Sequence, residues 1–138
     1  MIYLIRSHGK EGNSLLKIGY TDSLQTRSYS YLEHNPLLDI LNTREGDEEL
    51  ELLLQLRFIY YKADILKEWF KDEQEILNHF KDRIEDLYMW LWIHREDAFK
   101  ENTRSKKIKS IFRKIWETHA PLDDPEYEKS DLEEKLLK

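Results

Sequence analysis

The sequence predicts an α+β fold in which three strands and two helices, in the order β-β-α-β-α, precede a helical extension. Two observations carry this prediction. Short β-favouring segments alternate with helical segments over residues 1–60, whereas the apolar residues beyond residue 72 recur at steps of three and four. The length of 138 residues, with 40% hydrophobic and 12% aromatic residues, is sufficient for one compact domain with an appendage.

A β-hairpin is predicted at the start of the chain. Residues 1–6 are apolar and β-favouring, residues 8–14 have the composition of a loop, and residues 15–20 return to a strand-like pattern. This succession is typical of two strands joined by a long connection.

A helix and a third strand are predicted next. Asp22 and Gln25 have the spacing of an N-cap and its reciprocal partner, which indicates a helix over residues 23–34. Pro36 ends this helix, because the residue before a proline is disfavoured in the α region. Residues 37–43 then have the composition of a strand.

Helical periodicity dominates the rest of the chain. It predicts a helix over residues 48–60, with Leu50, Leu53, Leu54 and Phe58 on one face. A long helix is predicted from Asp72 to beyond Trp92, since Asp72 and Glu75 repeat the capping-box spacing before a periodic apolar series. An amphipathic helix is predicted over residues 105–118, after which Pro121 and Pro125 break the chain.

These elements predict three regions: a first domain at residues 1–80, a helical extension at 81–120 and an acidic tail at 121–138. The extension is rich in aromatic residues, which we expect to pack helix on helix. A homodimer or partner interface is the competing interpretation of this aromatic surface, which is formed by Tyr88, Trp90, Trp92 and Trp116.

Composition excludes several function classes. The absence of cysteine excludes disulfides, thiolate metal sites and a cysteine nucleophile. The apolar run at the N-terminus is too short for a signal peptide, and no apolar stretch is long enough for a membrane span, so we expect a soluble intracellular protein without a membrane partner.

The charge is unevenly distributed. A net charge of −6 argues against a simple nucleic-acid binder, yet residues 103–116 contain six basic residues and no acidic one. We refer to these residues as the basic strip. Its cations either form the solvated face of a helix or contact a DNA backbone, the latter through Lys106, Lys107, Lys109 and Arg113.

A series of short motifs resembles the GIY-YIG nuclease superfamily over residues 1 to about 80. The closest resemblance is to small phage, viral and microbial members whose second motif is K-I-G-x-T and which carry an E-W-F triplet. The matching residues, in order, are Ile2-Tyr3, Lys17-Ile18-Gly19-Tyr20-Thr21, Arg27, Asn35-Pro36, Glu51 with Phe58, and Glu68-Trp69-Phe70.

The resemblance implies a small three-stranded antiparallel sheet flanked by helices, and metal-dependent hydrolysis of DNA phosphodiesters. It further implies that Tyr3 helps to activate the attacking water, that Arg27 holds the scissile phosphate, and that Glu51 binds Mg²⁺ or Mn²⁺. Tyr31, one helical turn after Arg27, joins the same site. Gly19 would let the backbone approach the substrate closely.

These residue types suit the chemistry. A guanidinium meets two phosphate oxygens in a bidentate geometry, and a hard divalent cation that keeps several waters can be recruited by one carboxylate. Glu51 is preferred over Glu48 and Glu49, because those two fit the usual acidic first turn of a helix, whereas Glu51 has the family spacing to Phe58.

Three departures from the family pattern lead to two hypotheses about the function. The first motif lacks its glycine, Gln55 stands where the branch has a histidine, and Lys17 replaces the second-motif tyrosine. A lysine there takes up a proton only if it is held neutral, and otherwise binds phosphate. The first hypothesis is therefore a metal-dependent endonuclease or nicking enzyme. The alternative is a catalytically weakened module that binds nucleic acid or a protein partner without cutting.

Overall fold

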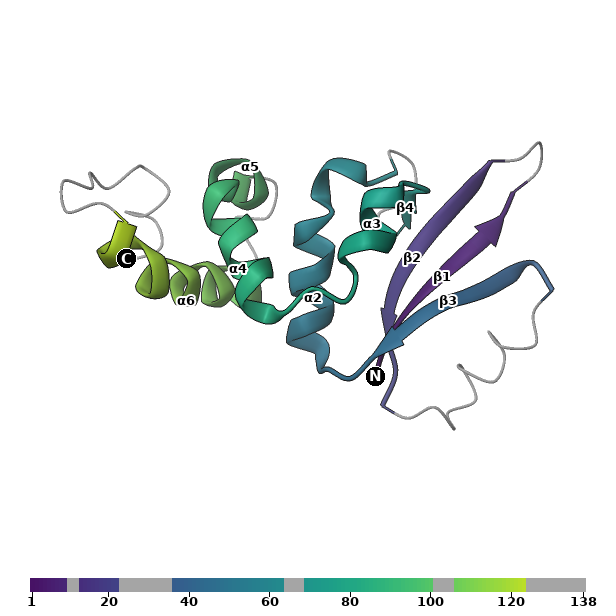
Figure 1. Ribbon diagram of the computed structural model, residues 1–138, viewed down its shortest axis with the longest axis horizontal. Coiled ribbons are helices and arrows are strands. Elements are labelled where there is room, and N and C mark those ends of the chain that lie inside the picture. Colours follow the sequence, from purple (N-terminus) through teal and green to yellow (C-terminus); the bar gives the residue numbers. More distant parts are fainter. Residues whose placement is uncertain (10–12, 23–35, 64–68, 101–105, 124–138) are drawn as a thin grey trace. The chain divides into compact units, whose positions relative to one another are not determined.

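The α+β class predicted from the sequence is confirmed by a computed structural model, which describes residues 1–9, 13–22, 36–63, 69–100 and 106–123 (Figure 1). The chain divides into two compact units, Met1–Asp82 and Arg83–Lys138. The helix predicted over residues 23–34 lies outside the described residues.

The first unit contains a four-stranded antiparallel sheet with the strand order β3-β1-β2-β4. The three predicted strands are confirmed as β1 (Ile2–His8), β2 (Ser14–Tyr20) and β3 (Leu38–Arg44). The short edge strand β4 (Trp69–Lys71) was not predicted. Three residues are too few to show a two-residue period, so only pairing with β2 reveals this strand.

Most of the described apolar core of this unit lies on the face of the sheet that helix α2 (Glu48–Arg57) covers, whereas Ile5 is buried on the opposite face. Ile2, Leu4, Leu16 and Ile18 are almost fully buried, as are the helical residues Leu54, Phe58, Ile76 and Phe80. Gly46 makes this packing possible, because a Cβ there would lie 2.7 Å from Ile2 Cδ1 and 2.5 Å from Leu50 Cδ2. The sheet and helix α2 therefore meet over Gly46.

Helix α2 forms where the sequence predicts it. The Asp47 carboxylate caps its first turn by accepting a hydrogen bond from Leu50 N at 2.9 Å. The α-helix ends at Arg57, and the remainder of the predicted helix becomes the 3₁₀ turn η2 (Ile59–Tyr61).

The long helix predicted from Asp72 is wrong. The structure contains α3 (Gln74–His79), α4 (Ile84–Ile93) and α5 (Arg95–Lys100) instead. Asp72 does not cap α3, because its carboxylate accepts hydrogen bonds from Arg6 Nε at 2.7 Å and from Ser14 Oγ. Tertiary partners thus compete successfully for the side chain that the local pattern assigned to a capping box.

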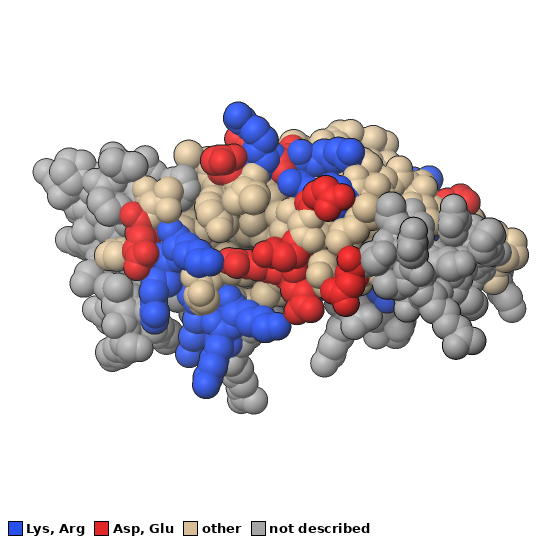
Figure 2. Space-filling view, turned by 90° about the horizontal axis from the view of Figure 1, so that it is seen from below, with Lys and Arg blue, Asp and Glu red and all other residues tan. Residues whose placement is uncertain are grey.

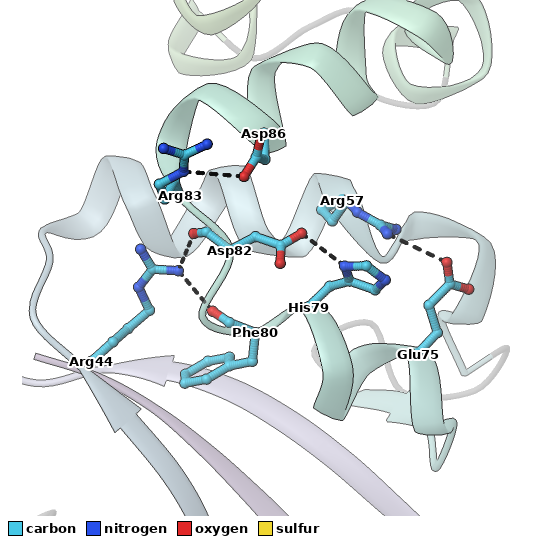
Figure 3. A network of polar contacts seen from close by, with 8 residues as sticks. All are labelled: Arg44, Arg57, Glu75, His79, Phe80, Asp82, Arg83 and Asp86. Atoms are coloured by element: carbon cyan, nitrogen blue, oxygen red, sulfur yellow. Dashed lines mark hydrogen bonds and ion pairs between the residues drawn. The ribbon is translucent and has the colours of Figure 1, made fainter.

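The break between α3 and α4 has a similar cause (Figure 3). In a continuous helix the carbonyls of Phe80 and Asp82 would accept from backbone N–H groups four residues later. Here both accept from Arg44 Nη1, at 2.7 and 2.8 Å respectively, and Arg83 is extended. An arginine at the end of β3 therefore ends the first unit.

Buried charge secures the helical side of the first unit. The Arg57 side chain is only 4% exposed and donates a hydrogen bond to Glu75 at 3.3 Å (Figure 3). The hydroxyl of Tyr61 donates to the same carboxylate. These hydrogen bonds and the charge of Arg57 hold the pKa of Glu75 below its usual range, although burial opposes them. The pair ties α2 to α3.

The second unit is built from α4, α5 and α6 (Lys106–Asp123). Its described buried residues are Leu87, Leu91, Trp92 and Ala98 together with Ile108, Ile111, Phe112 and Ile115 of α6. The predicted amphipathic helix is confirmed, but α6 continues through Pro121, so the predicted break there is wrong. Trp90 stacks on His94 with ring centroids 4.2 Å apart. The homodimer interpretation stays a prediction.

Candidate functional site

Tyr3 and Gly19 form the most closely fitted pair of the predicted site. They lie opposite one another in the β1–β2 register, so both face the same side of the sheet. A Cβ on Gly19 would lie 2.3 Å from both Cζ and the hydroxyl oxygen of Tyr3. The missing side chain of Gly19 thus makes room for the phenol ring. The substrate contact predicted for Gly19 stays a prediction.

Lys17 lies on the same face of β2, two residues before Gly19. Its register partner in β4 is Trp69, and Lys17 Nζ lies 5.6 Å from the centroid of the Trp69 ring. Of the two rings of the E-W-F triplet, Phe70 is fully buried in the core, whereas Trp69 is half-buried on the opposite face, because successive side chains of a strand alternate between faces.

Glu51 reaches the same segment of β2 from α2. Its Oε1 accepts a hydrogen bond from Gln55 Nε2 at 3.2 Å, and that amide also donates to the backbone carbonyl of Ile18 at 3.4 Å. Gln55 therefore links the half-buried carboxylate of Glu51 to the residue next to Gly19. The sequence offered Gln55 only as a departure from the family pattern, because its contact with β2 is tertiary.

Acidic groups gather near the end of β2. The hydroxyl of Tyr20 donates to Asp22 Oδ1 at 2.9 Å. This hydrogen bond, partial burial and the charges of Asp22, Glu48 and Asp47 raise the pKa of Tyr20. The acids at the end of β2 and in the first turn of α2 thus act on Tyr20 together. The N-terminal ammonium lies between the same two segments, because it donates to Thr21 O at 2.7 Å and to Gly46 O at 3.4 Å.

The described residues contain no group of three or more His, Asp or Glu side chains placed to hold a metal ion. A metal in this part of the chain would need a small set of protein ligands supplemented by water. Mg²⁺ accepts such a site, because it dehydrates reluctantly and is usually bound by one or two carboxylates.

Arg27 and Tyr31 lie outside the described residues. The structure thus places Tyr3, Gly19 and Lys17 on one face of the sheet and connects Glu51 to Ile18 of β2 through Gln55. The convergence of Glu51, Arg27 and Tyr31 with Tyr3 on one surface stays a prediction.

The basic strip forms an exposed surface of α6. The helix buries its apolar residues, and Figure 2 shows Lys and Arg side chains gathered on one part of the surface. The exposed cations are Lys106, Lys107, Lys109, Arg113 and Lys114. The first turn of α6 contains no acidic residue, so the positive helix terminus adds to their charge. Among the described helices, none has the length and apolar character needed to cross a membrane.

Comparison with protein-family models matches residues 1–85 to the T5orf172 domain. Neither the curated proteins nor the solved structures that were compared include a match to the chain.

Proposed function

The chain belongs to the T5orf172 domain family, and on that premise we propose that it is a metal-dependent DNA endonuclease or nicking enzyme with a GIY-YIG-type site. T5orf172 is a phage-associated domain related to nuclease-like folds. The observations that support the proposal are the close fit of Tyr3 over Gly19 and the connection of Glu51, through Gln55, to the neighbouring residue Ile18.

In this proposal the residues of the chain have separate roles. The Tyr3 hydroxyl, held over Gly19, orients the attacking water and accepts its hydrogen bond. Arg27 would bind the non-bridging oxygens of the scissile phosphate in a bidentate geometry that lysine cannot copy. Tyr31 has the i, i+4 spacing to Arg27 that would let it act at the same phosphate in the predicted helix. Charge develops on the phosphate during attack, so a fixed guanidinium stabilises the transition state more than the ground state.

The residues at this segment of β2 fit a divalent cation that keeps its waters. Glu51 supplies a hard oxygen donor, and its orientation is restrained by Gln55. When bound, Mg²⁺ or Mn²⁺ would supply positive charge beside the leaving oxygen. Glu51 would hold it, together with water ligands.

Cleavage of supercoiled plasmid tests the proposal. We expect the wild-type chain to nick or linearise plasmid with Mg²⁺ or Mn²⁺ and to stop when EDTA is added. Arg27→Ala and Glu51→Gln should each lose at least about a hundredfold in rate with the fold intact. Glu49→Gln is the matched control, since Glu49 is an exposed acid in the same helical turn. Full Mn²⁺-dependent cutting by Glu51→Gln would show that Glu51 is not the metal ligand, and Glu48 and Glu49 would be the next acids to test.

A second function is favoured by Lys17, which stands at the second-motif tyrosine and lies over Trp69. If the site has lost its proton-transfer chemistry, the chain binds nucleic acid or a protein partner without cutting. The same experiment separates the two functions: DNA binding without metal-dependent cleavage supports the binding module.

A further inference from the structure

Lys17 and Trp69 form a pair that the family resemblance does not explain. The Lys17 ammonium lies 5.6 Å from the centroid of the Trp69 ring, which is within the range of a cation–π contact. The two residues are direct register partners on neighbouring strands, so the contact belongs to the sheet itself.

The backbone gives the Trp69 ring a defined position. Its neighbour Phe70 is fully buried and pairs with the equally buried Leu16, which directs Trp69 to the opposite face of the sheet. On its other edge β4 is held by Ala63 N, which donates to Trp69 O at 2.9 Å. Pairing on both edges and the anchor at Phe70 prevent the indole from turning toward the core.

This position separates Lys17 from Tyr3. Tyr3 reaches β2 from β1 and lies over Gly19, whereas the Lys17 ammonium lies toward β4. The two groups therefore flank β2 on the same face, two residues apart along the strand. A bound phosphodiester could meet the phenol and the ammonium at different oxygens or at successive phosphates.

The chemistry of the contact selects one protonation state. The face of an indole attracts an ammonium through its quadrupole, and a neutral amine gains no comparable attraction. A lysine that serves as a proton acceptor must spend time neutral, whereas a lysine that binds phosphate must stay charged.

We infer that Trp69 is a positioning residue that holds Lys17 as a fixed cation for a phosphate of the DNA backbone, and that Lys17 is not the base of the reaction. The inference rests on the proposed function, which it deepens by assigning the role of the second-motif lysine. Tyr3 then orients the attacking water without help from Lys17.

The test measures DNA affinity and cleavage separately in the full chain. Binding of a fluorescent duplex in EDTA is followed by anisotropy, and cleavage is followed in Mn²⁺ as a function of pH. We expect Lys17→Met to weaken binding about three- to tenfold and Trp69→Leu about two- to fivefold. Trp69→Leu in the Lys17→Met background should change nothing further. Lys71→Met is the matched control, because Lys71 is an exposed lysine two residues along β4, and it should bind within about twofold of wild type.

Conservative variants separate the two roles of the lysine. Lys17→Arg keeps a cation that cannot be deprotonated, so it should recover most of the affinity that Lys17→Met loses, and its cleavage should keep the pH profile of the wild-type chain. Trp69→Phe should recover part of the affinity that Trp69→Leu loses. Loss of cleavage in Lys17→Arg at every pH, with normal binding, would identify Lys17 as the base and overturn the inference.

A DNA-independent measurement checks the contact itself. The ε-methylene protons of Lys17 should show an upfield ring-current shift by NMR that disappears in Trp69→Leu, provided that the remaining spectrum is conserved. If the ε-methylene protons of Lys17 show no ring-current shift in the wild-type chain, the positioning role of Trp69 is overturned. If the shift is present but the chain binds no DNA, both the proposed function and the phosphate role of Lys17 fail, and the pair is structural. If the chain binds DNA without cutting, only the nuclease proposal fails, and the binding measurements still decide the role of Lys17.

Discussion

Gly19→Ala is the substitution whose effect follows most directly from the structure. An alanine Cβ would lie 2.3 Å from Cζ and the hydroxyl oxygen of Tyr3 and 2.6 Å from Cε2, whereas ordinary contacts begin at 3.4 Å. To reach an ordinary contact, the phenol ring must therefore move away by the difference between 3.4 and 2.3 Å, or about 1.1 Å. An alanine at position 19 thus requires Tyr3 to move.

Two opposing terms set the effect on stability. Forcing an extra methyl into a packed site costs about 1–3 kcal/mol. Replacing a strand glycine by alanine recovers about 0.5–1 kcal/mol of backbone entropy. We therefore expect Gly19→Ala to lower the free energy of unfolding by about 1–2 kcal/mol. Because a misplacement of about 1 Å can cost about a hundredfold in rate, plasmid cleavage should fall much more than stability does.

A double-mutant cycle with Tyr3→Val isolates the cause. Without the phenol ring, Gly19→Ala should be neutral or stabilising by about 0.5 kcal/mol. Urea unfolding of the four chains, followed by circular dichroism, measures the coupling. Equal destabilisation by Gly19→Ala in both backgrounds would refute the reasoning, because the glycine would then be required for something other than Tyr3.

Three further predictions follow from other contacts. Burial favours the neutral form of Asp72, but hydrogen bonds from Ser14 and Arg6 outweigh it and hold the pKa of Asp72 below its usual value. Asp72→Asn should therefore cost about 1–2 kcal/mol at pH 7. Urea unfolding should show this difference shrinking once the pH falls below the usual carboxyl pKa of about 3.9 and disappearing as it passes through the lower folded-state pKa. Gln55→Leu should reduce plasmid cleavage about tenfold while Glu51 is retained, because the carboxylate loses its link to β2. If the basic strip contacts DNA phosphates, each contact should add about 0.9 to the steepness with which log affinity falls against log salt. The variant that combines Lys106→Ala, Lys107→Ala and Lys109→Ala should therefore show a flatter slope, and an unchanged slope would mean that the strip is only a solvated helix face.

Much of the fold follows from patterns within a few residues. The hairpin, β3 and α2 were predicted because β-favouring runs and the three-to-four spacing of leucines depend only on near neighbours. The motif order also placed Tyr3, Gly19 and Glu51 among the site residues. Gln55 and Tyr20 were missed as partners of the site, because nothing in their local sequence indicates a contact with Ile18 or with acids at the start of α2.

The fold class and most elements of the first unit were predictable from the sequence, since hydrophobic period and turn signals are local properties of the chain. Where the helices stop, and which residues share a face of the sheet, depended on contacts between distant parts of the chain. Asp72 leaves its capping box for Arg6, 66 residues away, and Arg44 ends α3 through carbonyls 36 and 38 residues away. Such contacts override weak local preferences, because burying a charged group requires a partner wherever the chain supplies one. Strand pairing is likewise tertiary: Trp69 lies beside Lys17 only once β4 has paired with β2 and Phe70 has entered the core.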